Sequence, residues 1–151
     1  MERVSTIVLA GILITTPLSA LAALGGNASS IISDSTHMRA QMRTTVSNGY
    51  SVHALQTETG IHVREYISAQ GTVFAVAWDG PNLPDLTQLL GDYFPAFQAA
   101  MTERRSRGVR GPVALRQDDL VIESNGHMRA YFGRAYVPSL LPPQVSSAEI
   151  Q

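Results

Sequence analysis

Three consecutive runs of alternating apolar and polar residues constrain the fold of this 151-residue chain more than any other feature. The runs are YSVHALQ (50–56), IHVREYI (61–67) and TVFAVAW (72–78), and a period of two residues is typical of β-strands. Their connections, TETG and SAQG, both end in glycine, which suits a turn that closes on a residue with positive φ. The sequence therefore predicts a three-stranded antiparallel meander.

The alternation also predicts which face of the meander is buried. With Gln56 opposite Ile61 and Ile67 opposite Thr72, most large apolar side chains share one face, whereas a slip of one residue would turn a strand's apolar set away. The expected core face comprises Tyr50, Val52, Ala54, Ile61, Val63, Ile67, Phe74, Val76 and Trp78. The other, polar face comprises Ser51, His53, Leu55, His62, Arg64, Tyr66, Val73, Ala75 and Ala77.

A helix is predicted after the meander. Residues 79–81 have a turn signature, and Asp85 is placed to cap a helix that follows. Apolar residues between 86 and 101 recur at the spacing of one helical stripe, which is expected to cover the core face. Pro95 lies within the stripe, so we expect a kink there or two short helices that meet at an angle. Trp78 is expected to anchor the core.

A second β-hairpin is predicted near the C-terminus. Extended segments at 118–124 and 127–138 flank Asn125-Gly126, the strongest short hairpin turn, and a shorter extended piece at 112–116 precedes them. We therefore expect an α+β domain: an antiparallel sheet of about five strands, made of a three-stranded meander, a kinked amphipathic helix and a C-terminal hairpin, with the helix packed on one face.

The N-terminal residues read as an export signal. A mostly apolar run over 4–18 follows Arg3, and Ala20 and Ala22 fit an A-x-A cleavage site. We expect a Sec-type signal peptide over 1–22, cleavage after Ala22, and release to the periplasm or the extracellular space. The alternative is an uncleaved signal anchor, for which the run is short and diluted by polar residues.

The remaining segments carry weaker signals. Residues 23–49 are predicted to be weakly structured apart from a short helix expected over 34–42. We expect a single α+β domain over residues 50–137. Residues 138–151 are proline-broken and are expected to form a C-terminal tail over the surface.

Composition excludes several classes of chemistry. The chain has no cysteine and no lysine, which removes thiol nucleophiles, thiolate metal sites, disulfides and Schiff-base catalysis. The net charge of −1 argues against a nucleic-acid partner. No metal motif, cofactor fingerprint or paired catalytic carboxylates are recognisable, so we expect no metal and no cofactor.

Three groups of residues are candidates for a site. Glu65 falls on the expected core face, where burial would raise the pKa of a carboxyl group, as in many acid–base catalysts. The alternative is a marginal position or a bulge that turns Glu65 outward. On the polar face, His53, His62, Arg64 and Tyr66 could form a shallow groove for an anion or a sugar, or simply the wet side of a sheet.

The third group is an arginine-rich stretch after the predicted helix. It could grip phosphate groups, those of lipid headgroups above all, or serve as a solvated linker whose charge suits a helix C-terminus. It comprises Arg104, Arg105, Arg107 and Arg110.

Residues 50–94, with ALGG upstream and GHMRAYFGRAYVPSLLP downstream, resemble a family of small secreted proteobacterial proteins catalogued as domain of unknown function 2844. The resemblance covers nearly all of the expected mature chain. It implies export and no activity, cofactor or catalytic residue.

We therefore expect an exported, non-catalytic protein that binds an envelope component or a protein partner through the polar sheet face or the arginines. It would meet the membrane only through the signal segment. One rival is a small periplasmic hydrolase or isomerase that uses Glu65 with His53 or His62. Another is a signal-anchored accessory of envelope assembly or secretion.

Overall fold

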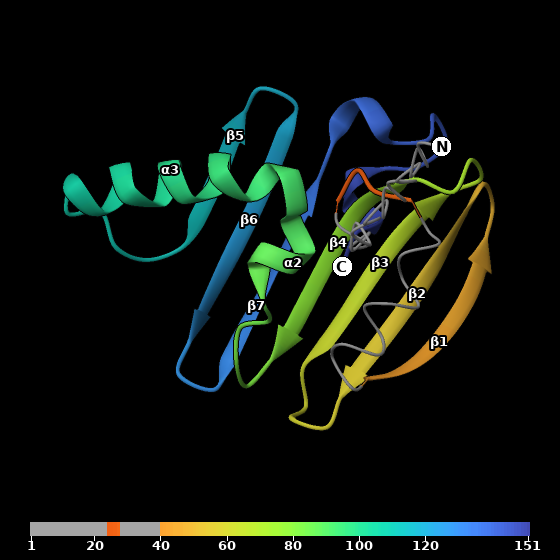
Figure 1. Cartoon of the computed structure of the whole chain (residues 1–151), viewed down its shortest axis with the longest axis horizontal. Coiled ribbons are helices and arrows are strands. Elements are labelled where there is room, and N and C mark those ends of the chain that lie inside the picture. The colour runs from red at the N-terminus through yellow and green to blue at the C-terminus, as the bar shows by residue number, and fades with distance from the viewer. Residues whose placement is uncertain (1–23, 28–39) are drawn as a thin grey trace, which may run out of the picture.

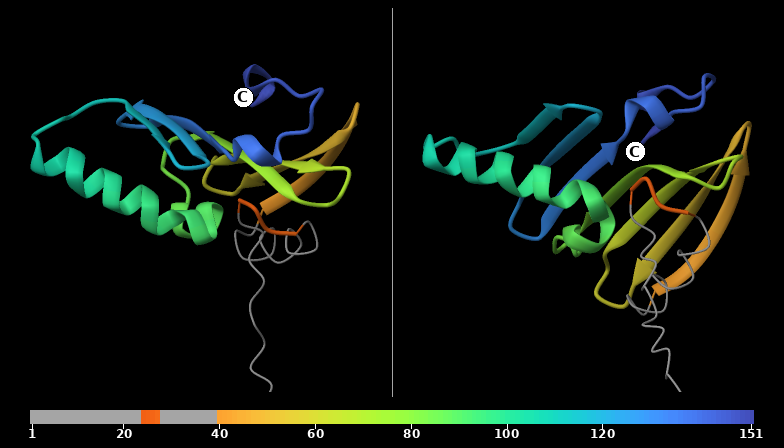
Figure 2. Two further views of the ribbon diagram at one scale, coloured as in Figure 1. Left: turned by 90° about the horizontal axis from the view of Figure 1, so that it is seen from above. Right: turned by 45° about the horizontal axis from the view of Figure 1, so that its top comes forward.

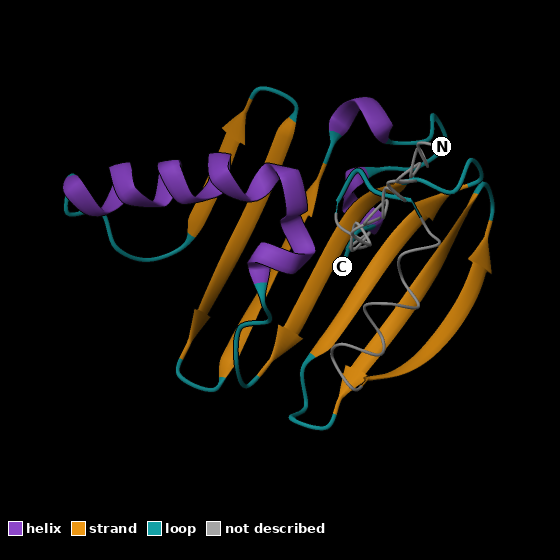
Figure 3. Ribbon diagram, viewed as in Figure 1, coloured by secondary structure: helices purple, strands orange, loops and turns teal. Residues whose placement is uncertain are grey.

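The computed structural model describes residues 24–27 and 40–151, and these form one antiparallel sheet with a helical segment on one side (Figures 1 and 3). The seven strands follow the spatial order β1-β2-β3-β4-β7-β6-β5. Two meanders meet at the centre of the sheet, where β4 pairs with β7. The strands are β1 (Ala40–Ser47), β2 (Tyr50–Thr57), β3 (His62–Ser68), β4 (Val73–Gly80), β5 (Val113–Gln117), β6 (Leu120–His127) and β7 (Ala130–Tyr136).

The α+β fold of about five strands that the sequence predicts is wrong. The sheet has seven strands and dominates the described residues, and one helical segment of 21 residues follows β4. The clearest omission is β1, which includes residues 40–42 of the helix expected over 34–42; the rest of that helix lies outside the described residues. Seven of the eight residues of β1 are exposed, so this edge strand has no buried face, and its few alternating apolar residues give only a weak strand signal.

The helical segment has three parts: α2 (Leu86–Leu90), the 3-10 turn η2 (Gly91–Tyr93) and α3 (Phe94–Ser106). The carboxylate of Asp85 caps α2 by accepting hydrogen bonds from the backbone N–H groups of Thr87 (2.9 Å) and Gln88 (3.3 Å).

Pro95 lies in the first turn of α3, where a helix does not need the N–H donor that proline lacks. The chain accordingly changes direction between α2 and α3 (Figure 1). None of the described helices is long and apolar enough to cross a membrane.

Both faces of the sheet carry other parts of the chain (Figure 2). The helical segment and residues 24–27 lie on one side, which we call the helix face. Residues 137–151 lie on the other side, over part of what we call the C-terminal face. Two hydrophobic clusters result, one on each face of the sheet.

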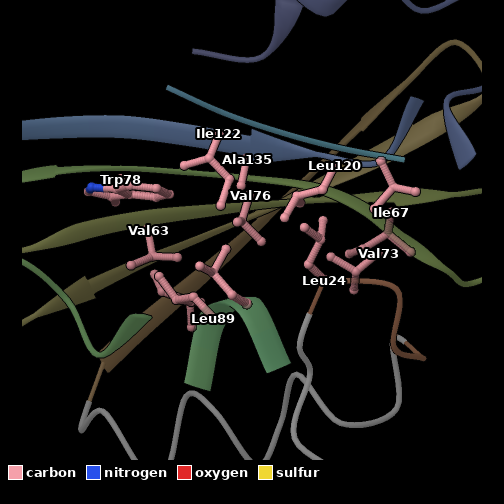
Figure 4. Close-up of a cluster of buried hydrophobic side chains, with 13 residues drawn as sticks. Leu24, Val63, Ile67, Val73, Val76, Trp78, Leu89, Leu120, Ile122 and Ala135 are labelled. Carbon is pink, nitrogen blue, oxygen red and sulfur yellow. The ribbon is translucent and has the colours of Figure 1, made fainter. Parts of the chain in front are cut away.

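The larger cluster lies on the helix face and joins β2, β3, β4, β6, β7 and α2 (Figure 4). Val76, Trp78 and Leu90 meet within it, as the sequence predicts. Leu24 belongs to it as well, because its backbone N–H donates to the Leu89 carbonyl at 3.0 Å and its side chain is buried. Burying each such aliphatic side chain stabilises the fold by roughly 1.5–3 kcal/mol.

The second cluster makes the C-terminal segment part of the fold. The rings of Tyr50, Tyr66 and Phe74 contact one another, with centroids 6.0–6.2 Å apart. Val145 and Ile150 pack against this group, and Ile150 exposes 0% of its surface. The segment therefore covers an apolar surface of the sheet rather than lying loosely over it.

The predicted register between β2 and β3 is wrong by one residue. Gln56 pairs with His62, not with Ile61, so Leu55 joins Val63 on the helix face, while Tyr50, Val52 and Ala54 turn to the C-terminal face. The physical reason is that both faces are covered. Apolar residues are then needed at both odd and even positions of a strand, and the alternation no longer selects one register.

A β-bulge between β3 and β4 changes the face on which Phe74 lies. Ile67 pairs with Val73 and Tyr66 with Ala75, which leaves Phe74 as an extra residue in β4. Phe74 is thereby moved from the expected core face to the cluster on the C-terminal face.

The turn of the second hairpin also lies elsewhere than predicted. Strand β6 continues to His127, and the chain reverses at Met128 and Arg129, where Arg129 has a φ of 67°. Gly126 lies inside β6, and a Cβ atom there would come within 2.7 Å of the Ala130 carbonyl oxygen. Glycine is needed at this position for close contact between two strands, not for a turn.

Candidate functional site

The four polar residues expected on one face are divided between the two faces. His62, Arg64 and Tyr66 lie on the C-terminal face, whereas His53 pairs with Glu65 and lies on the helix face. The register shift between β2 and β3 causes this division. The predicted groove of four residues is therefore not formed as such.

On the C-terminal face, Asp79 of β4 accepts hydrogen bonds from His62, its cross-strand partner, and from Arg64, two residues along the same strand. Its Oδ2 atom lies 3.0 Å from His62 Nδ1, and its Oδ1 atom lies 2.9 Å from Arg64 Nη1. Burial raises the pKa of Asp79, but the hydrogen bonds and charges of His62 and Arg64 outweigh that effect and leave the pKa below its ordinary value. Asp79 is thus a carboxylate at neutral pH.

Arg64 and Tyr66 use part of their hydrogen-bonding capacity on the C-terminal segment of the chain. The hydroxyl group of Tyr66 donates to the main-chain oxygen of Gln151 at 2.9 Å and accepts from the Gln151 N–H at 3.0 Å. Arg64 Nε donates to the same oxygen. Nearby, the hydroxyl group of Tyr50 donates to Glu149 at 3.2 Å. Two predicted binding residues therefore fasten the C-terminal segment to the sheet.

A second arginine, which sequence reasoning missed, completes this attachment. Arg134 of β7 donates through Nε to Glu123 at 2.8 Å and through Nη1 to the carbonyl groups of Ser147 (2.8 Å) and Ile150 (3.0 Å). Arg134 and Glu123 face each other across β6 and β7. Only the register of that hairpin could have revealed the pair, and a turn placed at Asn125-Gly126 gives the wrong register.

Beside the C-terminal segment, the sheet carries a groove of about 560 Å³. Its charged part is formed by Arg64 and Asp79 together with Arg134 and Glu123. Its apolar part includes Phe132, which is 53% exposed. In full it is lined by Arg64, Trp78, Asp79, Pro112, Val113, Ala114, Glu123, Ser124, Asn125, Phe132, Gly133, Arg134 and Gln151.

The model of the family described as "Protein of unknown function (DUF2844)" matches residues 20–150. The chain belongs to this family. The resemblance that residues 50–94 carry is thereby confirmed. No curated protein and no solved structure matches the chain. Because membership in the DUF2844 family assigns no reaction, the function of this member has to be argued from the geometry of its sites.

Of the two histidines predicted as acid–base partners of Glu65, the register shift brings His53 opposite it in this DUF2844 protein, whereas His62 lies on the other face of the sheet. His53 and Glu65 are cross-strand partners, and Glu65 exposes 0% of its surface. Burial lowers the pKa of His53, which favours the neutral imidazole. Its Nδ1 atom is buried and makes no hydrogen bond within the described part of the chain. A neutral base beside a carboxyl group can exchange a proton, but a substrate has to reach the pair first.

The four arginines of the arginine-rich stretch surround the C-terminal end of α3 in the DUF2844 protein. Arg104 and Arg105 lie in its last turn, Arg107 is the C-cap residue, and Arg110 follows in the loop. Arg107 forms an ion pair of 2.5 Å with Glu103. Among the described residues, no group of three or more histidine, aspartate or glutamate side chains could hold a metal ion.

Proposed function

We propose that this DUF2844 protein is an exported, non-catalytic binding protein whose ligand occupies the groove on the C-terminal face. The observation that carries the proposal is the groove itself, whose volume of about 560 Å³ falls within the range of typical small-molecule sites, about 300–1,000 Å³. Its lining combines an exposed aromatic side chain with a few fixed polar groups, as ligand sites usually do.

The charges of the groove indicate the class of ligand. Arg64 and Arg134 contribute two positive charges, and Asp79 and Glu123 contribute two negative ones. A groove that is balanced in this way favours a polar group without net charge, either neutral or zwitterionic. Phe132 and the apolar residues of β5 offer contact to a hydrocarbon part. The ligand we propose is therefore a small neutral or zwitterionic amphiphile of the cell envelope.

Export is supported by the sequence of residues 1–22, with its apolar run and small residues before Ala23. The absence of cysteine is compatible with an oxidising compartment, because the chain has no thiol to be oxidised there. The test is cell fractionation with mass spectrometry of the exported form. An intact chain that begins at Met1 and stays in the membrane fraction would favour the signal-anchored alternative.

Binding can be tested by isothermal titration, which needs no reporter in the groove, since the ring of Trp78 is 1% exposed and packs in the cluster on the helix face. The heat change would be measured while dodecylphosphocholine is added below its micelle concentration, beside dodecyl sulfate and dodecyltrimethylammonium. We expect a saturable change with the zwitterion at lower concentration than with either charged amphiphile. If none of the three amphiphiles produced a saturable change, the proposed ligand class would be refuted.

A pair of variants tests the position of the ligand. Phe132→Ala removes the exposed aromatic wall and should weaken binding about tenfold, since a contact worth about 1.4 kcal/mol is lost. Met128→Ala is the matched control, because Met128 belongs to the same hairpin, is 82% exposed and does not line the groove. Equal affinities of the two variants would place the ligand elsewhere.

The pairing of His53 with Glu65 supports a second candidate function, an acid–base reaction of a small hydrolase or isomerase. Its test is Glu65→Gln, which nearly preserves the shape of the side chain and removes the carboxylate. If the variant folds and supports the same cellular phenotype as the wild type, the catalytic candidate is excluded. The non-catalytic candidate is not affected by that result, since Glu65 does not line the groove.

A further inference from the structure

The C-terminal end of α3 and the loop that follows enclose a second hollow, separate from the groove. Its volume is about 360 Å³. We call it the arginine hollow. In Figure 1 this end of α3 projects beyond the edge strand β5, and Figure 2 shows it on the side of the sheet opposite the C-terminal segment. It is lined by Met101, Arg104, Arg105, Gly108, Val109 and Arg110.

The carbonyl groups in the last turn of α3 accept hydrogen bonds from backbone N–H groups, not from the arginine side chains. The N–H of Gly108 donates to the Arg105 carbonyl, and the N–H of Val109 donates to the Arg104 carbonyl, both at 3.0 Å. This pair of bonds is a Schellman motif, and Gly108 has the left-handed conformation it requires, with φ of 69°. Arginines near a helix C-terminus often bind the last carbonyl groups. Here those carbonyl groups already have donors.

The guanidinium groups of the hollow therefore retain most of their donors. Arg104 uses Nη2 to donate to the Pro112 carbonyl at 2.8 Å, which fixes its side chain against the loop. Arg105 and Arg110 make no hydrogen bond or ion pair with the described residues. The one carboxylate in this turn, Glu103, is paired with Arg107, which does not line the hollow. Three positive charges thus line one cavity without a carboxylate among its lining residues.

We propose that the arginine hollow binds a phosphate-bearing anion. Planar guanidinium groups match the oxygens of phosphate and can bind them with two hydrogen bonds each. Met101 and Val109 give the hollow apolar sides, which lower the local dielectric constant and strengthen such contacts. The shared chemistry is the phosphate group, which a soluble phosphate compound or an anionic phospholipid headgroup can supply. The site does not depend on occupation of the groove.

The experiment measures the full chain in two arms. Isothermal titration with inorganic pyrophosphate tests a soluble anion. Co-sedimentation with vesicles of phosphatidylglycerol and phosphatidylcholine tests a headgroup, and vesicles of phosphatidylcholine alone correct for binding through the apolar N-terminal run. The variants are Arg105→Gln combined with Arg110→Gln, and Arg107→Gln as the control on the same helix end.

We expect the double variant to lose roughly fivefold in binding for each arginine removed, while Arg107→Gln binds like the wild type. Saturable pyrophosphate binding with this pattern identifies a soluble phosphate ligand. Preference for phosphatidylglycerol vesicles with the same pattern, and no pyrophosphate binding, identifies a headgroup. The proposal is overturned if neither arm shows binding. It is also overturned if Arg107→Gln loses as much binding per charge removed as the double variant does, because general attraction to positive charge would then explain the binding.

Discussion

The indole ring of Trp78 lies against Gly133 on the neighbouring strand, where a Cβ atom would come within 2.4 Å of the ring atom Cζ2. The two residues are cross-strand partners of β4 and β7, the pair of strands that joins the two meanders. Trp78 is 1% exposed in this position. The absence of a side chain at Gly133 therefore makes room for the largest residue of the core.

Gly133→Ala should destabilise the protein by about 1–3 kcal/mol, because an added methyl group in a filled core displaces its neighbours. Urea unfolding followed by circular dichroism measures the change. In a Trp78→Phe background the penalty should be smaller, since phenylalanine lacks the atoms that the new methyl group meets. An equal penalty in both backgrounds would show that the ring is not the cause.

Ile150→Ala should destabilise the protein by about 2–5 kcal/mol, as expected for a buried aliphatic side chain. The prediction distinguishes a C-terminal segment that belongs to the core from one that only lies on the surface. Thermal unfolding of the variant is compared with that of Val46→Ala, whose side chain is 82% exposed on β1. Similar melting temperatures for the two variants would contradict the packing of residues 137–151.

The pH dependence of stability should contain a contribution from Asp79. Hydrogen bonds from His62 and Arg64 lower its pKa from the ordinary value of 3.8, so the unfolded chain binds a proton at higher pH than the folded chain does. This contribution to stability is present above pH 3.8 and is lost as the pH falls through the lower, folded pKa.

Asp79→Asn should accordingly be less stable than the wild type at neutral pH and should lose less stability on acidification below about pH 4. Urea unfolding midpoints between pH 7 and pH 2.5 measure both effects. The control is Asp118→Asn, which removes one carboxylate from the exposed turn between β5 and β6. A slope for Asp79→Asn that equals the wild-type slope would count against the ion pairs.

Leu24→Ala should destabilise the protein by about 2–5 kcal/mol, because Leu24 is buried among residues of β4 and α2. Leu83→Ala is the matched control, with the same truncation at a side chain that is 46% exposed. Denaturant unfolding of the two variants gives the comparison. An equally small effect of both would mean that residues 24–27 are not needed for the core.

The sequence predicts the local elements of this protein better than their assembly. The strands at 50–57, 62–68 and 73–80 are marked by alternation and by glycine turns, and Asp85 caps its helix as expected. The fold class failed because β1 is an exposed edge strand whose alternating apolar residues, Ala40, Met42 and Val46, are too few to mark a buried face. An Asn-Gly pair does mark its turn, at Asn48-Gly49, where Gly49 has a φ of 84°. At Asn125-Gly126 the same pair lies inside a strand, so the dipeptide alone does not locate a turn.

The candidate site was predictable only in part, for a related reason. The sequence identifies the polar residues His62, Arg64 and Tyr66. It does not identify Asp79, which pairs with His62 and Arg64, or the pair of Arg134 and Glu123, in which Arg134 holds the C-terminal segment. Their roles follow from pairings between distant segments. When both faces of a sheet are covered, the odd and the even positions of a strand both carry apolar residues. The sequence of one strand then does not reveal which face its polar residues occupy.

Both ends of the described chain contribute to the buried layers: Leu24 on the helix face and Ile150 on the C-terminal face. Each layer is therefore completed by a contact between segments that are far apart in the sequence, and loss of either segment would expose one apolar side of the sheet. Because contacts of high sequence separation form slowly, we expect the closing of these two layers to be a late step in folding.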